Sequence, residues 1–122
     1  MELLILLALF QIKHCYVDFV LQSTEQIRCK GIWLNPIGIS HSLEHVYCSL
    51  IALLIFSLYI PVDPFDILIV AFAEGLLHYI IDFIKINYGS KDTSTPLFWK
   101  QFGVDQLAHQ LTYLGMIVYL IN

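Results

Sequence analysis

The sequence predicts an all-α integral membrane protein, a four-helix bundle made of two repeated helical hairpins. Of its 122 residues, 58% are hydrophobic and only 13% are charged, and the mean hydropathy is +0.74. A soluble domain carries about 25% charged residues, so this chain has little polar surface with which to cover a core that faces water. Four apolar segments of membrane-spanning length predict the four helices, and an internal repeat predicts the two hairpins.

Four segments reach the roughly 20 mostly apolar residues that a helix needs to cross a bilayer. They are Glu2–Gln22, His41–Ile60, Phe65–Lys85 and Val104–Ile121. All prolines fall between these segments, as uninterrupted helices require. We expect the first segment to be a retained helix rather than a cleaved secretory signal, because its leading charge is Glu2 and no clear small-residue cleavage site follows. Residues 1–122 are therefore expected to form a single transmembrane domain.

The connections between the segments predict their arrangement. The short connection Pro61–Pro64 makes the second and third segments antiparallel neighbours. The two other connections run to roughly 18 residues, could hold interfacial turns, and each carry one tryptophan suited to the headgroup region. They also hold or adjoin most of the basic residues, Arg28, Lys30, Lys85, Lys91 and Lys100. The positive-inside rule then places these connections in the cytoplasm and both chain termini outside it.

The two halves of the chain follow one plan at an offset of 64 residues. In this alignment His14, Asp18, His41 and His45 correspond to His78, Asp82, Asp105 and His109. Each half, residues about 1–60 and about 65–122, contains a helix ending in H-x-x-x-D, a long loop, and a helix opening with two ligand-type residues. Both hairpins would enter the membrane from the same side, so we expect parallel repeats related by a pseudo-two-fold axis along the membrane normal.

The spacing i, i+4, which all four pairs share, puts both members of each pair on one helix face. The pairs are His14/Asp18, His41/His45, His78/Asp82 and Asp105/His109. They end the first and third segments and begin the second and fourth, so all are expected at one depth, a turn or two inside the cytoplasmic boundary. An aspartate at the centre of a membrane helix costs about 2.5–3.5 kcal/mol, so these aspartates must face each other, the histidines or a cation. The sequence therefore predicts one intramembrane cluster, interpreted as a metal site.

Imidazole and carboxylate ligands without thiolate suit zinc, manganese or iron, and zinc is our first choice. Eight candidate ligands exceed one tetrahedral shell and suit two ions about 3.5–4 Å apart. A proton relay or interhelical hydrogen bonds between the same residues are the alternatives to a metal site. The three cysteines have neither the spacing of a thiolate zinc site nor that of a disulfide framework.

Two glutamates are the candidate catalytic residues. The segment His41–His45 spells H-x-x-E-H, the inverted zinc-protease motif, in which Glu44 would be the general base. Glu74 lies one turn from His78, on the helix face that His78 and Asp82 share. Either glutamate could be a ligand, a base for an activated water or a group that orients a histidine.

Other polar and small residues of the helices receive structural interpretations. Lys13 lies off the helix face that carries the candidate ligands His14 and Asp18, and its side chain is expected to extend toward the membrane interface. Gly75 and Gly115 are expected to permit close helix packing. Interhelical hydrogen bonds, and contacts to the ligands, are expected for Gln11, Gln22, Gln106 and Gln110.

Residues 14–22 resemble the H-x-x-x-D-F-x-L-Q opening of a family of small bacterial and phage membrane proteins with no assigned function. The later signatures look similar too, at His41–His45, His78–Asp82 and Asp105–His109. More loosely, the chain is similar to bacterial membrane proteins classed as metal-dependent hydrolases, although it lacks their Pro-Asp-x-Asp-His and Thr-His-Ser runs. The resemblance implies an intramembrane metal site and, as location, the bacterial inner (plasma) membrane.

These observations lead to a functional hypothesis. We expect a metal-dependent hydrolase that acts on a lipid-linked ester or phosphoester at the cytoplasmic leaflet, with water activated by the ion. The alternatives are an ion or proton carrier, a metal-stabilised membrane protein that binds a partner, and an intramembrane metalloprotease using His41, Glu44 and His45. The net charge of −4 gives no basic surface for nucleic acid, which excludes that class of partner, and the oligomeric state is left open.

Overall fold

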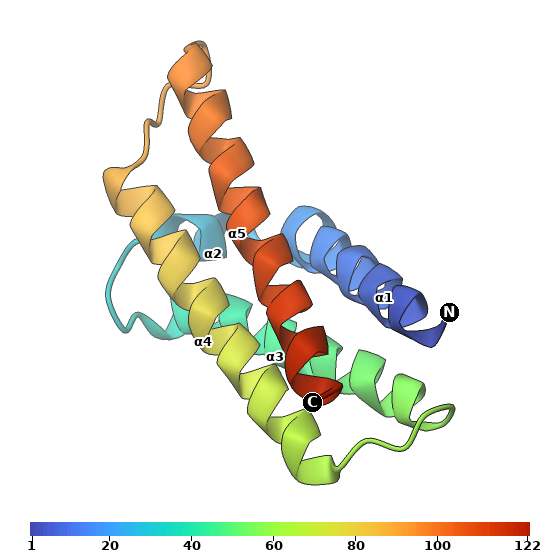
Figure 1. The fold of residues 1–122 in the computed structure, drawn as a ribbon. Coiled ribbons are helices and arrows are strands. Elements are labelled where there is room, and N and C mark those ends of the chain that lie inside the picture. Colours follow the sequence, from blue (N-terminus) through green and yellow to red (C-terminus); the bar gives the residue numbers. More distant parts are fainter.

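The computed structural model describes all residues, 1–122, and contains helices and no strands (Figure 1). In chain order its elements are α1 (Glu2–Tyr16), the π-helical turn η1 (Val17–Leu21), α2 (Thr24–Cys29), α3 (Pro36–Ser57), α4 (Pro64–Tyr88) and α5 (Pro96–Leu120). Because η1 follows α1 without a break, the first predicted segment is one helix that ends a residue before Gln22. The all-α prediction is confirmed.

Three helical segments are long and apolar enough to cross a membrane, which indicates a membrane protein. They are Glu2–Leu21, Pro36–Ser57 and Pro64–Tyr88. The predicted fourth span lies in α5, which has the same 25 residues as α4 but is not among the three. Its hydropathy is lower because Asp105, Gln106, His109 and Gln110 interrupt the apolar sequence.

Each long helix packs against two others. Helix α3 contacts α1 and α4, and α5 contacts α4 and α1. The short connection 58–63 makes α3 and α4 antiparallel neighbours, as predicted (Figure 1). In the first long connection the predicted interfacial turn is the short helix α2, which packs on α3 and begins with a capping box between Ser23 and Gln26. The internal repeat stays a prediction.

Three prolines begin helices instead of lying between them, which corrects the predicted boundaries. Pro36, Pro64 and Pro96 are the first residues of α3, α4 and α5, where a missing N–H is harmless. The side chains that cap these helices are Asn35, Asp63 and Thr95, which accept hydrogen bonds from backbone N–H groups of the first turn.

The ligand pairs lie at different distances from the ends of their helices, and their depth in a membrane stays a prediction. Asp105 lies nine residues after Pro96, which is about 14 Å along the axis of α5. His78 lies ten residues before Tyr88, or about 15 Å from the end of α4. The pair His41/His45 is closer to its helix end, in the second and third turns of α3.

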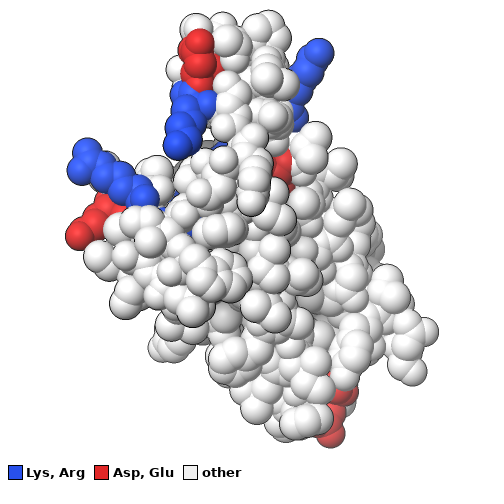
Figure 2. All heavy atoms as spheres, turned by 90° about the vertical axis from the view of Figure 1, so that its left-hand side faces the viewer, with Lys and Arg blue, Asp and Glu red and all other residues white.

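The interior is divided into an apolar half and a polar half. Twelve buried side chains form the apolar core, which fills the half near the chain termini: Leu6, Phe10, Val46, Ala52, Leu53, Phe56, Ile67, Val70, Ala71, Tyr113, Met116 and Ile117. Seven of the eight predicted ligands are buried in the other half, and Asp18 is partly buried there. On the face that Figure 2 shows, Lys and Arg side chains gather toward the end where α4 finishes and α5 begins, together with some acidic side chains, and most of the rest of this face is without charge.

Gly75 permits close packing of α4 on α3, as predicted, whereas Gly115 does not pack closely against another helix. A Cβ added at Gly75 would lie 2.2 Å from Cγ2 of Val46, and one added at Gly115 would meet nothing within 4 Å. Val46 is β-branched and has little rotamer freedom in a helix, so it cannot easily move aside.

We therefore predict that Gly75→Ala lowers the melting temperature of the detergent-purified protein, measured by circular dichroism. Overpacking costs about 1–3 kcal/mol, which exceeds the gain of up to about 1 kcal/mol from replacing a helical glycine with alanine. Gly115→Ala is the matched control and should leave the melting temperature equal or higher. The double variant Val46→Ala/Gly75→Ala should recover part of the loss; equal melting temperatures for both glycine variants would contradict this packing account.

Candidate metal centre

The structure brings all eight predicted ligands together in one buried cluster. Their ligand atoms form three groups, each within 4.8 Å: Asp18, His41, His45 and His78; His14, His78 and His109; and Asp82, Asp105 and His109. His78 and His109 each belong to two groups, so the three groups are continuous. These buried groups could hold a metal ion; their role as ligands stays a prediction.

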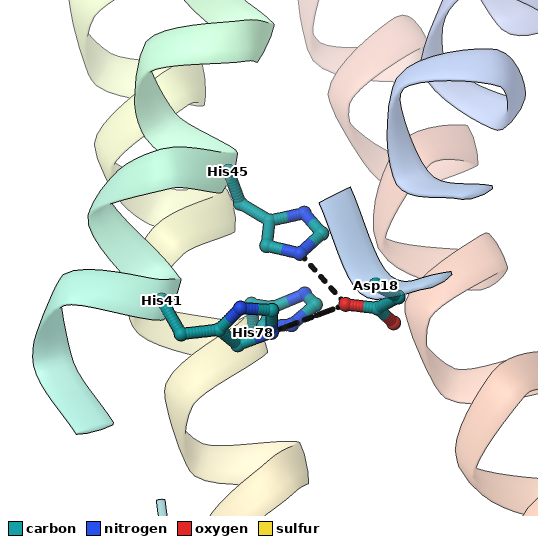
Figure 3. Close-up of side chains that lie close together, drawn as sticks. All are labelled: Asp18, His41, His45 and His78. Carbon is teal, nitrogen blue, oxygen red and sulfur yellow. Dashed lines mark hydrogen bonds and ion pairs between the residues drawn. The ribbon is translucent and has the colours of Figure 1, made fainter. Parts of the chain in front are cut away.

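The first group converges on one oxygen atom, Oδ1 of Asp18 (Figure 3). This oxygen lies 2.9 Å from Nε2 of His45, 3.1 Å from Nε2 of His41 and 3.6 Å from Nε2 of His78. The Nε2 atoms of His41 and His78 are 3.2 Å apart. Zinc ligands at about 2.0–2.1 Å in a tetrahedron lie about 3.3 Å from one another, so the donor atoms already have the separations of such a shell.

The π-helical turn η1 carries Asp18 into this group. In η1 the N–H of Gln22 bonds to the carbonyl of Val17, five residues earlier. Such a turn changes the direction of side chains relative to an α-helix and is frequent at functional sites. The chain leaves the helix immediately afterwards, and the amide of Gln22 lies 2.8 Å from Nε2 of His41. Spacing alone did not predict this turn.

The remaining groups extend the cluster toward α5. Nε2 of His109 lies 3.8 Å from Oδ1 of Asp82 and 3.7 Å from Oδ1 of Asp105. Nε2 of His78 lies 3.4 Å from Oδ2 of Asp82, which links this part to the first group. The two separations at His109 are longer than those around Asp18, so this second part is the looser of the two.

Three of the histidines direct Nε2 into the cluster and face a different partner with Nδ1. Nδ1 of His14 lies 2.9 Å from the Tyr113 hydroxyl. Nδ1 of His45 lies 3.6 Å from Glu74, and Nδ1 of His41 lies 3.7 Å from Glu44. A carboxylate or hydroxyl behind a ligating histidine fixes its tautomer and ring orientation. Both candidate catalytic glutamates therefore lie on the Nδ1 side of a histidine, at distances longer than a hydrogen bond, and at His45 the Lys13 ammonium is closer to Nδ1, at 3.2 Å.

Glu74 is fully buried and already has several partners. It forms an ion pair with Lys13, and it accepts hydrogen bonds from Ser49 at 2.6 Å and from Tyr113 at 3.2 Å. Lys13 is 7% exposed and its Nζ lies 3.2 Å from Nδ1 of His45, so the expectation that it reaches the interface is wrong. The salt bridge compensates its burial instead.

Glu44 lies at the edge of the cluster, where its side chain is 35% exposed. One of its oxygens accepts a 2.7 Å hydrogen bond from Gln26 of α2. Among the glutamines, Gln22 contacts His41 and Gln106 contacts His14, which confirms contacts to the ligands; Gln110 is exposed and has no such contact. Gln11 is half-buried.

Lysine partners distinguish Asp18 from the other buried carboxylates. Glu74 pairs with Lys13, Asp82 with Lys30 at 3.0 Å, and Asp105 with Lys85 at 3.6 Å. Asp18 has only histidine nitrogens within ion-pair distance. At full ionisation Asp18 and the half-buried Glu44 are thus two carboxylates without a lysine, and a divalent cation would balance their charge.

Unpartnered buried atoms provide an independent sign that a cation fits here. Five buried side-chain atoms lack a hydrogen-bond partner, and all belong to the cluster or its edge: Nδ1 of His41 and His78, Nε2 of His109, Oδ1 of Asp105 and Oε2 of Glu44. A buried polar atom without a partner is uncommon and costs about 1–3 kcal/mol. Oδ1 of Asp105 and Nε2 of His109 face each other, and both are atoms of the kind that bind metal ions.

Sequence reasoning did not identify Lys13, Lys30 and Tyr113 as parts of the cluster. Lys30 is expected in the first long connection and lies just after α2, yet it is buried against Asp82. Tyr113 follows His109 by four residues in α5, and this spacing was the available signal for a side chain on the same face.

We predict that Lys13→Met strongly destabilises the protein, because it leaves Glu74 buried without a counter-charge. Breaking a buried pair in this way costs about 3–5 kcal/mol. Thermal unfolding in detergent should show the loss, and Lys13→Met/Glu74→Gln should recover most of it. Lys91→Met at an exposed lysine is the control. The account of this pair fails if the single and double variants unfold at the same temperature.

Comparison with known proteins assigns the chain to a family. No curated protein and no solved structure gave a significant match. A family model described as "Protein of unknown function (DUF3307)" matches residues 5–122, which is nearly the whole chain. This match agrees with the expected membership of a family without an assigned function. The chain therefore belongs to the DUF3307 family of proteins of unknown function.

Proposed function

We propose that the chain is a membrane-embedded, metal-dependent hydrolase of a lipid-linked ester or phosphoester. One observation carries this proposal: Asp18 is the buried carboxylate without a lysine partner, and three histidine Nε2 atoms lie around its Oδ1. Three nitrogen ligands and one oxygen ligand without sulfur suit zinc, which remains our first choice over manganese and iron.

A second ion would bind between His109, Asp82 and Asp105. The shared position of His78 and His109 between groups brings the two sites close together, as in hydrolases that use paired ions. This second site would bind more weakly, because Lys30 and Lys85 already neutralise Asp82 and Asp105. We therefore propose one tight ion near Asp18 and a weaker one near Asp105.

The residues around the cluster support hydrolysis in distinct ways. A bound ion polarises an ester or phosphoryl oxygen and makes water a better nucleophile. Glu74 and Glu44 lie on the Nδ1 sides of His45 and His41, where they would help to position the two rings, a role that replaces the role of general base. Oδ1 of Asp105 is buried and unpartnered; it would bind the second ion or, when only the tight ion is bound, accept a proton from the attacking water.

We also propose that α5 crosses the membrane with the other long helices. Its buried side includes Asp105, His109 and Tyr113, and its exposed side includes the apolar residues Val104, Leu107, Leu111, Leu114 and Val118. Polar groups inside and apolar groups outside are the arrangement that a membrane helix needs. By the positive-inside rule, the end bearing Arg28, Lys91 and Lys100 would face the cytoplasm.

The alternative functions receive less support from the structure. A proton or ion carrier needs a polar route from both sides, but the apolar core closes the half near the termini. A protease built only on His41, Glu44 and His45 would not need Asp18, which contacts both histidines. Glu44 also lies on the Nδ1 side of His41, away from the Nε2 atoms.

Metal analysis and an activity assay test the proposal together. We predict that purified protein contains one to two equivalents of zinc or manganese by elemental mass spectrometry, and that Asp18→Asn or His41→Ala/His45→Ala removes the tight ion. Hydrolysis of phospholipid esters in proteoliposomes should fall at least about a hundredfold in the same variants, the scale of losing a metal's contribution.

Gln110→Ala is the matched control, because Gln110 neighbours His109 in sequence but is exposed. It should keep both metal and activity. Folded wild-type protein without metal would refute the metal site, and activity that survives both ligand substitutions would refute the hydrolase.

A further inference from the structure

A pocket beside the cluster opens between the end of α4 and the beginning of α5. It has a volume of about 420 Å³ and an apolar wall formed by Ile81, Ile84, Tyr88, Val104 and Ala108. Its polar lining consists of Lys85, Lys100, Gln101 and Asp105, with the backbone of Gly89. Asp105 belongs to both the pocket and the cluster, so the pocket borders the candidate metal centre.

The lysines give this pocket an unequal distribution of charge. Lys85 is 22% exposed at its side chain, pairs with Asp105 and lies with Nζ 4.9 Å from the centre of the Phe102 ring. Lys100 is exposed and has no ion-pair partner. An ammonium group has three N–H donors, so Lys85 can bind an anion while it stays near Asp105. Two lysines against one carboxylate leave the pocket with a net positive charge.

The aromatic residues near the pocket are typical of the membrane interface, where lipid headgroups lie. The large aromatic side chains Tyr88 and Trp99 are exposed beside it, and Trp33 is exposed at the same end of the molecule. Tryptophan and tyrosine prefer the membrane interface. Deeper in the pocket the wall is apolar, as an acyl chain requires. Positive charge at the interface and an apolar wall below it complement an anionic lipid.

We propose that this pocket binds the phosphate headgroup of a membrane lipid through Lys85 and Lys100, with an acyl chain against Ile81, Ile84 and Ala108. The identification of this lipid as substrate rests on the proposed hydrolase function, whereas binding of the lipid does not. A phosphate held by the two lysines lies next to Asp105, so its ester bond faces the cluster. The pocket thereby defines the substrate class as lipids that carry a phosphate ester.

Binding can be tested without catalysis in the His41→Ala/His45→Ala variant, which retains every pocket residue. Native mass spectrometry or a fluorescence titration in detergent would measure affinity for a short-chain phosphatidic acid. We expect one lipid per chain with equal affinity in wild type and this variant. Lys85→Gln/Lys100→Gln should bind about thirtyfold more weakly, because each interfacial lysine contributes several-fold to the affinity for an anionic lipid.

Two matched controls distinguish binding in the pocket from non-specific electrostatic attraction of the lipid to the protein. Lys91→Gln removes an exposed lysine of the same end outside the pocket and should leave the affinity unchanged. Ala108→Phe should block the apolar wall and abolish binding, whereas Leu107→Phe on the exposed neighbouring position should not. This pair does not alter any charge, so it tests the pocket even if the lysine variant folds poorly.

Several results would overturn the proposal. Unchanged affinity in Lys85→Gln/Lys100→Gln or in Ala108→Phe would show that the lipid binds elsewhere. Equal affinity for inorganic phosphate, or for an uncharged diacylglycerol, would show that the pocket does not recognise a lipid phosphate. Specific binding of phosphatidic acid without turnover by wild type would refute the hydrolase and keep the lipid site. Turnover of other lipids without binding of phosphatidic acid would refute the lipid site and keep the hydrolase.

Discussion

The need to compensate buried charge governs the polar half of this structure. A carboxylate or ammonium group taken out of water is costly unless an opposite charge or several hydrogen bonds replace the solvent. Lys13, Lys30 and Lys85 meet this need for Glu74, Asp82 and Asp105. Asp18 has three histidine Nε2 atoms within 3.6 Å of its Oδ1 and no lysine. We propose that a divalent cation bound by the histidines and Asp18 would complete the same pattern of compensation at the remaining position.

The fold divides two tasks between the two halves of the helices. Near the termini, twelve apolar side chains hold the long helices together and close one end of the interior. In the other half, the helices carry the ligands, while α2 and the residues after it contribute Gln26 to Glu44 and Lys30 to Asp82. The pocket between α4 and α5 borders the cluster at Asp105. A lipid phosphate could therefore approach from the headgroup region without passing the apolar core.

Much of the fold and cluster could be predicted because periodicity is local information. Spacing of four residues placed His14 with Asp18 and His78 with Asp82 on common faces, and the sequence alone brought all eight ligands to one place. Helix starts were predicted too late, because a proline in the first turn, at Pro36 or Pro96, was interpreted as a break. The lysine partners and the turn η1 depend on which side chains meet across helices. That information is absent from the spacing within one helix, and so Lys13 was predicted to leave the interior that it occupies.

X-ray absorption spectroscopy at the metal edge of the purified protein tests the central claim most directly, because it reports the ligands themselves. The account predicts a single shell of nitrogen and oxygen atoms at about 2.0–2.1 Å, outer-shell scattering from about three imidazole rings, and no sulfur. Substitution of Asp18 by asparagine should abolish or rearrange this spectrum. Metal-free folded protein, or a bound metal whose spectrum lacks imidazole scattering, would contradict the claim that Asp18 and its histidines form a metal centre.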